Sequence, residues 1–142
     1  MGRFLFTLAV AVWTGTVVSL SYVILPGIHA WAREGQARDL LRRLFPRYHM
    51  VGIVCGLIAL ATVATAPRSA TFGVADRVLL AAPVAVALLC ALIGRQVLVP
   101  RLAAIQAENR PETFEGVHRA AAMLNTTTLA MLILALAAVS TK

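Results

Sequence analysis

Charged side chains are scarce in this 142-residue chain, and acidic ones are the scarcest. Only 13% of the residues are charged, against about 25% in an ordinary soluble domain. Hydrophobic residues make up 60% of the chain, which is more apolar surface than a soluble core of this length can bury. The composition therefore predicts a membrane protein.

The long apolar runs contain no Asp or Glu at all. Proton relays and cation paths inside membranes are commonly built on such carboxylates, so the sequence argues against both. It also has no Gly-rich phosphate loop, no paired carboxylates for a cleft and no nucleophile elbow. The sequence thus contains no enzymatic signature, and a non-enzymatic role is favoured without excluding an enzyme.

Small residues within the runs are interpreted as packing positions. Only two cysteines occur, Cys55 and Cys90, each inside an apolar run, and a disulfide or metal pair is not expected from them. Gly52 and Gly56 are four residues apart on the second run, a spacing that lets helices approach closely in lipid.

Four apolar runs are long enough to cross a bilayer, which takes about 20 residues within a range of about 17–25. They cover about residues 4–25, 48–66, 78–99 and 120–139. Hydrocarbon offers no hydrogen bonds to the backbone, so each run is expected to be a helix. The prediction is an all-α, four-helix transmembrane bundle forming one domain over residues 1–142. The first run is expected to be a retained helix, because it is longer than the core of a signal peptide.

The basic residues lie mostly in the gaps between the runs, and their distribution predicts an orientation. The connections at residues 27–47 and 100–119, with Arg95 at their boundary, carry nine of them, and the opposite side carries four. Basic loops tend to stay in the cytoplasm, so both termini are expected outside the cytoplasm of a bacterial inner membrane. No nucleic-acid-binding motif accompanies these residues, and a nucleic-acid partner is not expected.

The chain also repeats short motifs. A Val-x-x-Pro sequence closes the first run at Pro26 and the third at Pro100, an offset of 74 residues. A Phe-x-x-x-His sequence then leads into the next run at His49 and at His118, an offset of 69. Short motifs can coincide by chance; taken as a repeat, they predict two tandem helical hairpins with long cytoplasmic connections, and both histidines at one depth.

The first connection has the pattern of a basic amphipathic helix, with Arg38, Arg42, Arg43 and Arg47 available to lipid headgroups. Two structures remain open for it: a helix lying flat on the bilayer, or an extension of the second span that caps the bundle. In the second connection, Pro111 is expected to begin the helix that leads into the fourth span.

Four polar residues near one end of the bundle form the candidate binding region: His49, Arg95, His118 and Asn125. Arg95 either extends its side chain to the membrane surface or points into the bundle, where it needs a partner. His118 and Asn125 are two helical turns apart and so share one face of the fourth span. An asparagine near the middle of a span is costly without a hydrogen-bond partner.

The paired histidines also suggest haem, because imidazole is a good axial ligand and helix bundles can hold a porphyrin. On this alternative, His49 and His118 ligate the iron of a haem-binding redox or haem-handling protein. The simpler interpretation is that each histidine lies at the interface where a helix enters the membrane. A third alternative is a transport or metal-export component, which would need oligomers to build a pathway.

These residues resemble a known family. The match consists of Leu44-Phe45-Pro46-x-Tyr48, of Arg95 with Val99-Pro100-Arg101, and of Phe114-Glu115-x-x-His118-Arg119 followed by Leu124-Asn125. It covers roughly residues 13–132 and resembles the small four-helix membrane proteins typified by transmembrane protein 205, a family of unknown function. The resemblance implies a four-span fold and shared polar positions, but no activity. The hairpin plan is also similar, by architecture alone, to copper-resistance D-like membrane proteins.

Together these observations favour a small non-enzymatic accessory or binding subunit of a membrane assembly. Its expected partners are the lipid bilayer and either other membrane proteins or further copies of the chain. The sequence leaves any cofactor unknown, with haem bound by His49 and His118 as the alternative.

Overall fold

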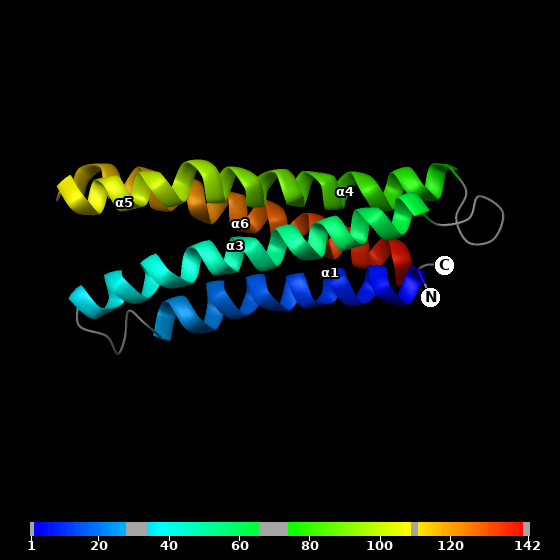
Figure 1. The fold of residues 1–142 in the computed structure, drawn as a ribbon, viewed down its shortest axis with the longest axis horizontal. Coiled ribbons are helices and arrows are strands. Elements are labelled where there is room, and N and C mark those ends of the chain that lie inside the picture. Colours follow the sequence, from blue (N-terminus) through cyan, green and yellow to red (C-terminus); the bar gives the residue numbers. More distant parts are fainter. Residues whose placement is uncertain (1, 28–33, 66–73, 109–110, 141–142) are drawn as a thin grey trace.

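The computed structural model describes residues 2–27, 34–65, 74–108 and 111–140, and within them the chain is helical without a strand (Figure 1). The elements are α1 (Gly2–Val18), the π-helical turn η1 (Ser19–Ile24), α3 (Glu34–Thr65), α4 (Val74–Ile93), the π-helical turn η2 (Gly94–Leu98), α5 (Val99–Glu108) and α6 (Pro111–Ser140).

Four stretches are long and apolar enough to cross a membrane, which confirms the predicted all-α, four-span architecture. They are Gly2–Gly27, Arg43–Thr65, Ala75–Ile105 and Arg119–Ser140. Large hydrophobic side chains cover the outside of the bundle: Phe4, Tyr22 and Val23 are each about two-thirds exposed. Such a surface would be unfavourable in water and suits a lipid surrounding.

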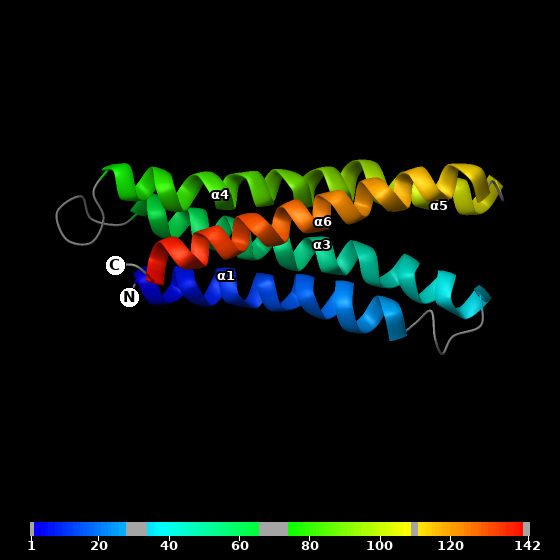
Figure 2. The same cartoon turned by 180° about the vertical axis from the view of Figure 1, so that it is seen from behind.

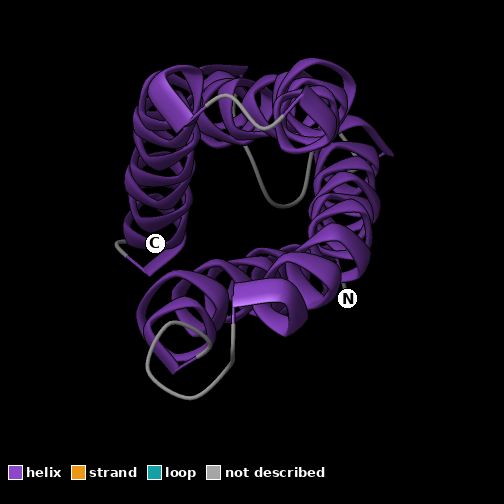
Figure 3. Cartoon of the chain, turned by 90° about the vertical axis from the view of Figure 1, so that its left-hand side faces the viewer, coloured by secondary structure: helices purple, strands orange, loops and turns teal. Residues whose placement is uncertain are grey.

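The helices form a ring in which α1 packs on α3, α3 on α4, α4 on α6, and α6 on α1. Seen along the long axis, they stand as the sides of a square (Figure 3). α1 begins and α6 ends at the same end of the bundle, here called the terminal end (Figure 2). There the Arg3 guanidinium donates a hydrogen bond of 3.2 Å to the Val139 carbonyl. The opposite end, where α3 begins and α5 ends, is called the connection end (Figure 1).

The core of the terminal half is apolar and closed. α1 turns a residue inward at every third or fourth position, as a helix face requires: Phe6, Val10, Trp13 and Val17. Leu20 of η1 continues this buried face. The other helices complete the layer with Leu80, Val84 and Leu132, each at most 2% exposed.

Two π-helical turns interrupt the bundle at equivalent places. The Leu25 N–H donates to the Leu20 carbonyl and the Val99 N–H to the Gly94 carbonyl, each five residues back rather than four. Pro26 and Pro100 follow directly, and a proline has no N–H and collides with the carbonyl four residues before it. Both hydrogen bonds are separated by the same 74 residues as the prolines, which supports the tandem repeat.

The two connections continue the spans. α3 runs unbroken from Glu34 to Thr65, with Pro46 inside it, so the first connection extends the second span and is not a separate helix on the bilayer. α6 begins at Pro111, as expected from the sequence. These extensions carry the bundle beyond the apolar spans at the connection end (Figure 1).

A polar chamber between the helices

Asn125 joins three segments of the bundle through its side-chain amide. Its Oδ1 accepts a hydrogen bond of 3.0 Å from the Tyr48 hydroxyl on α3. Its Nδ2 donates a longer bond of 3.4 Å to the Ser21 hydroxyl on η1. A carboxamide inside an apolar span therefore has its partners supplied by two other helices, which fixes how these helices are rotated against α6.

His49 is buried beside this network, with 9% of its surface exposed. Its ring stands edge-on to the neighbouring Tyr48 ring, with centroids 4.9 Å apart. The other side of the imidazole lies against the backbone of η2 at Gly94, where a Cβ atom would come within 2.9 Å of Nε2. Real Cβ atoms essentially never approach that closely, so the contact requires glycine at position 94.

A small chamber opens between these groups, with a volume of about 20 Å³. Tyr48, His49, Asn125 and Thr128 supply its polar lining. Its apolar walls are formed by Trp13, Phe45, Gly52, Cys90, Ala91, Leu98, Val99, Leu102, Ala121 and Leu124. A water molecule needs roughly 10–15 Å³ measured in this way, so the chamber has room for about one.

The Trp13 indole forms the floor of the chamber and lies across two glycines of α3. A Cβ atom at Gly52 would be 2.6 Å from Trp13 Nε1, and one at Gly56 would be 2.9 Å from Cζ3. The space at the glycine pair is thus filled by a side chain of α1. Trp13 was not predicted from the sequence as a site residue; the structure places it on the buried face of α1 with Phe6 and Val10.

The predicted cluster is brought together in part. His49 and Asn125 line the same chamber. Arg95 is half-buried and directly follows Gly94, the residue of η2 that lies against the His49 ring. The backbone of His118 belongs to α6, but its side chain lies outside the described part of the structure. Its place in the cluster therefore stays a prediction.

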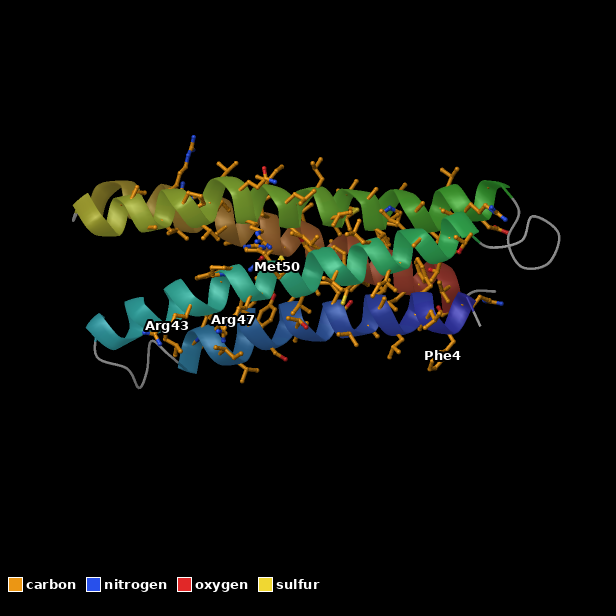
Figure 4. The ribbon with its side chains drawn as sticks, viewed as in Figure 1. Phe4, Arg43, Arg47 and Met50 are labelled. Atoms are coloured by element: carbon orange, nitrogen blue, oxygen red, sulfur yellow. The ribbon has the colours of Figure 1, made fainter. Side chains whose placement is uncertain are left out.

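The predicted headgroup contacts lie on α3 towards the connection end. Arg43 and Arg47 are exposed there, beyond Met50, while Phe4 marks the terminal end (Figure 4). The side chains of Arg38 and Arg42 are outside the described residues. Contact with lipid by all four stays a prediction.

Tyr48 and Ser21 were missed as site residues. Tyr48 precedes His49 and was quoted only as part of a family motif, and Ser21 sits in an unremarkable apolar run. The one signal for Ser21 is the repeat: with an offset of 74 residues, Ser21 occupies the position in the first hairpin that Arg95 occupies in the second.

The chamber beside His49 is far smaller than a haem pocket, and the haem alternative, which also needs His118, stays a prediction. Cofactor pockets measure about 300–1,000 Å³, more than ten times the volume beside His49. The His49 ring is also held against the backbone of Gly94, which leaves no gap there for a porphyrin. Within the described residues, no group of three or more His, Cys, Asp or Glu side chains is placed to hold a metal ion.

Comparison with known proteins gives a family without an assigned activity. No curated protein matches the chain, and no solved structure matches it. A family model matches residues 8–111, which include η1, the chamber-lining part of α3 and η2 but end where α6 begins. The chain therefore belongs to the family described as "Domain of unknown function (DUF4149)".

Proposed function

We propose that this protein is a small non-enzymatic binding subunit of a membrane assembly, and that its binding region is the polar chamber with the neighbouring Arg95. The observation that carries the proposal is the hydrogen-bonded arrangement of Tyr48, Asn125 and Ser21 beside the buried His49. Ionisable residues inside a membrane span are costly, and a buried histidine there is a candidate functional position.

The chemistry of the lining supports binding over catalysis. Its polar groups are a phenol, an imidazole, a carboxamide and a hydroxyl, and the Thr128 hydroxyl donates to the Leu124 carbonyl of its own helix. No carboxylate or ammonium group is among the lining residues that the structure describes. The Tyr48 hydroxyl already donates its proton to Asn125, so the set is suited to recognising a partner by hydrogen bonds.

The proposed setting is the inner membrane of a bacterium, with both termini outside the cytoplasm. Arg43 and Arg47 are exposed at the connection end, where anionic headgroups of the cytoplasmic leaflet would meet them, and Arg38 and Arg42 belong to the same helix. Single cysteines placed at residue 2 and at residue 107, in a Cys55→Ala, Cys90→Ala background, test the orientation with an impermeant thiol reagent. Labelling of residue 107 alone in intact cells would show the opposite orientation.

The finer relationships rest on sequence motifs. The likeness to transmembrane protein 205 uses motifs at residues 44–48 and 95–101, inside the stretch matched by the family model, and the α6 motif at residues 114–125, outside it. The likeness to copper-resistance D-like proteins is architectural. A transport or metal-export role would require a pathway, and one chain offers a chamber of water-molecule size.

The binding role can be tested by partner retention. The protein is purified from its native membrane in a lipid-preserving polymer, alongside Asn125→Ala, Arg95→Ala and the matched control Thr127→Ala, whose side chain is exposed on α6. We expect the first two variants to lose a co-purifying partner that wild type and control retain, with unchanged helical content. Equal retention by all four proteins would contradict the proposal.

A further inference from the structure

His49 has 9% of its surface exposed, and within the described residues no fully enclosed side-chain nitrogen or oxygen lacks a hydrogen-bond partner. The ring lines the chamber, in which the Tyr48 hydroxyl and the Asn125 amide are also found. Buried polar groups in native proteins nearly always have a partner, supplied by protein or by an ordered water molecule. The chamber is the place from which such a partner can reach His49.

The lining specifies what that partner must be. A neutral imidazole presents one N–H donor and one acceptor nitrogen. After bonding to each other, the Tyr48 oxygen can still accept and the Asn125 amide retains a second lone pair on Oδ1. The Thr128 oxygen can also accept, because its proton is used within α6. A molecule that both donates and accepts is therefore matched by the walls.

The size of the chamber and the charge of its lining further restrict which molecule can occupy it. The volume of about 20 Å³ fits one molecule of the size of water. Arg95 is not among the residues that line the chamber, and the other walls are apolar. A cation entering it would lose its hydration with no carboxylate among the lining residues, which is strongly unfavourable.

We propose that the chamber is a binding site for one neutral, water-sized hydrogen-bonding molecule, with water itself as the occupant, which joins His49 on α3 to Asn125 or Thr128 on α6. The inference rests on the proposed function in that both use this chamber. The bound molecule completes a polar layer in which α3, α6 and η1 are already linked by protein hydrogen bonds.

The experiment is solid-state NMR of the full chain, labelled with ¹⁵N on histidine and uniformly on the backbone, in vesicles of native lipid. Magnetisation is transferred from mobile and bound water protons to protein nitrogens, and the His49 ring signals are assigned by their loss in His49→Phe. The amides of Val10 and Leu132, which lie in the closed apolar layer, are the internal dry reference.

We expect transfer from water to a His49 ring nitrogen that clearly exceeds transfer to the dry reference amides. Ala121→Leu puts a larger side chain into the chamber and should abolish this transfer. Thr128→Val removes one acceptor with little change in volume and should weaken the transfer, which keeps the test usable if the first variant does not fold. Leu134→Ala, on the exposed face of α6, is the control and should leave the signal unchanged.

Transfer to His49 no greater than to the dry reference would overturn the inference. So would full transfer in Ala121→Leu, because water would then reach His49 by another route, and so would a signal from carbon-bound protons of another molecule. A dry chamber with partner loss in Asn125→Ala would leave the proposed function standing. A water-filled chamber with full partner retention in Asn125→Ala would support the water site and contradict the proposed binding function.

Discussion

The two halves of the bundle are built differently. In the terminal half, the helices meet through apolar side chains such as Phe6, Val10 and Leu132, each at most 1% exposed. Towards the connection end, the same helices meet through Tyr48, Asn125 and their hydrogen bonds, around a small chamber.

The difference shows what each half contributes in lipid. Lipid tails are as apolar as the core, so the close fit of side chains, not the exclusion of water, holds the apolar half together. Hydrogen bonds in the polar half add less energy but are directional, and they select one rotation of each helix. The expected stability effects therefore fall from the apolar half to the polar half and are smallest at the surface.

The largest effect is expected from Leu132→Ala in the apolar half, because the side chain is fully buried and its removal leaves a cavity. Leucine-to-alanine changes in cores cost about 3 kcal/mol. Unfolding by SDS, followed by circular dichroism in mixed micelles, measures the loss. Ile133→Ala, at a neighbouring position with 53% exposure, should change stability by no more than about 0.5 kcal/mol. Equal effects of the two changes would contradict the packing of α6.

Gly94→Ala should come next, because the added Cβ would collide with the His49 ring. Overpacking of this kind costs about 1–3 kcal/mol. The double variant Gly94→Ala, His49→Ala should recover much of that loss relative to His49→Ala alone, in the same unfolding assay. Gly15→Ala is the control, since nothing lies within 4 Å of its added Cβ. No recovery in the double variant would show that the contact with His49 is not what requires glycine.

The hydrogen bond between Tyr48 and Asn125 should have a smaller, separable effect. A double-mutant cycle of Tyr48→Phe and Asn125→Ala is expected to give a coupling energy of about 0.6 kcal/mol, typical of hydrogen bonds inside membranes. Tyr22→Phe, at a tyrosine that is 66% exposed, paired with Asn125→Ala should give none. A coupling of zero in the first cycle would mean that the two side chains are not bonded in the bilayer.

The smallest stability effect is expected from Arg43→Gln and Arg47→Gln, because both side chains are exposed. Unfolding should change by less than about 0.5 kcal/mol. Association with anionic lipid should weaken by about 1 kcal/mol per arginine, measured by native mass spectrometry with anionic and zwitterionic lipids. The difference should shrink at high salt. A loss that is equal for both lipids would show that these arginines do not contact headgroups through charge.

The sequence predicted the spans because hydropathy is a local property. The repeated Val-x-x-Pro motifs lie where the two π-helical turns end, but π-helical geometry was not predicted from them. The open question at the first connection was decided by the continuous α3, which local patterning alone did not settle.

The pairings inside the chamber could not be predicted for a physical reason. Tyr48 and Asn125 are 77 residues apart, and Asn125 and Ser21 are 104 apart. Each span is apolar all round, so the periodicity that reveals the buried face of a soluble helix is faint. Which polar residues meet depends on helix rotation, and that rotation is set by contacts such as Trp13 on Gly52.

The two π-helical turns have a mechanical consequence. Each holds one surplus residue in its helix, and one residue corresponds to about 100° of rotation around a helix axis. If the surplus moves by one turn, the residues it passes rotate while the segments on either side keep their places. Ser21 lies inside η1 and Gly94 begins η2, so such a shift would withdraw the partner of Asn125 in one hairpin and the surface beneath His49 in the other. The repeat thus gives the bundle two equivalent positions, η1 and η2, at which a helix can rotate beside the same polar layer.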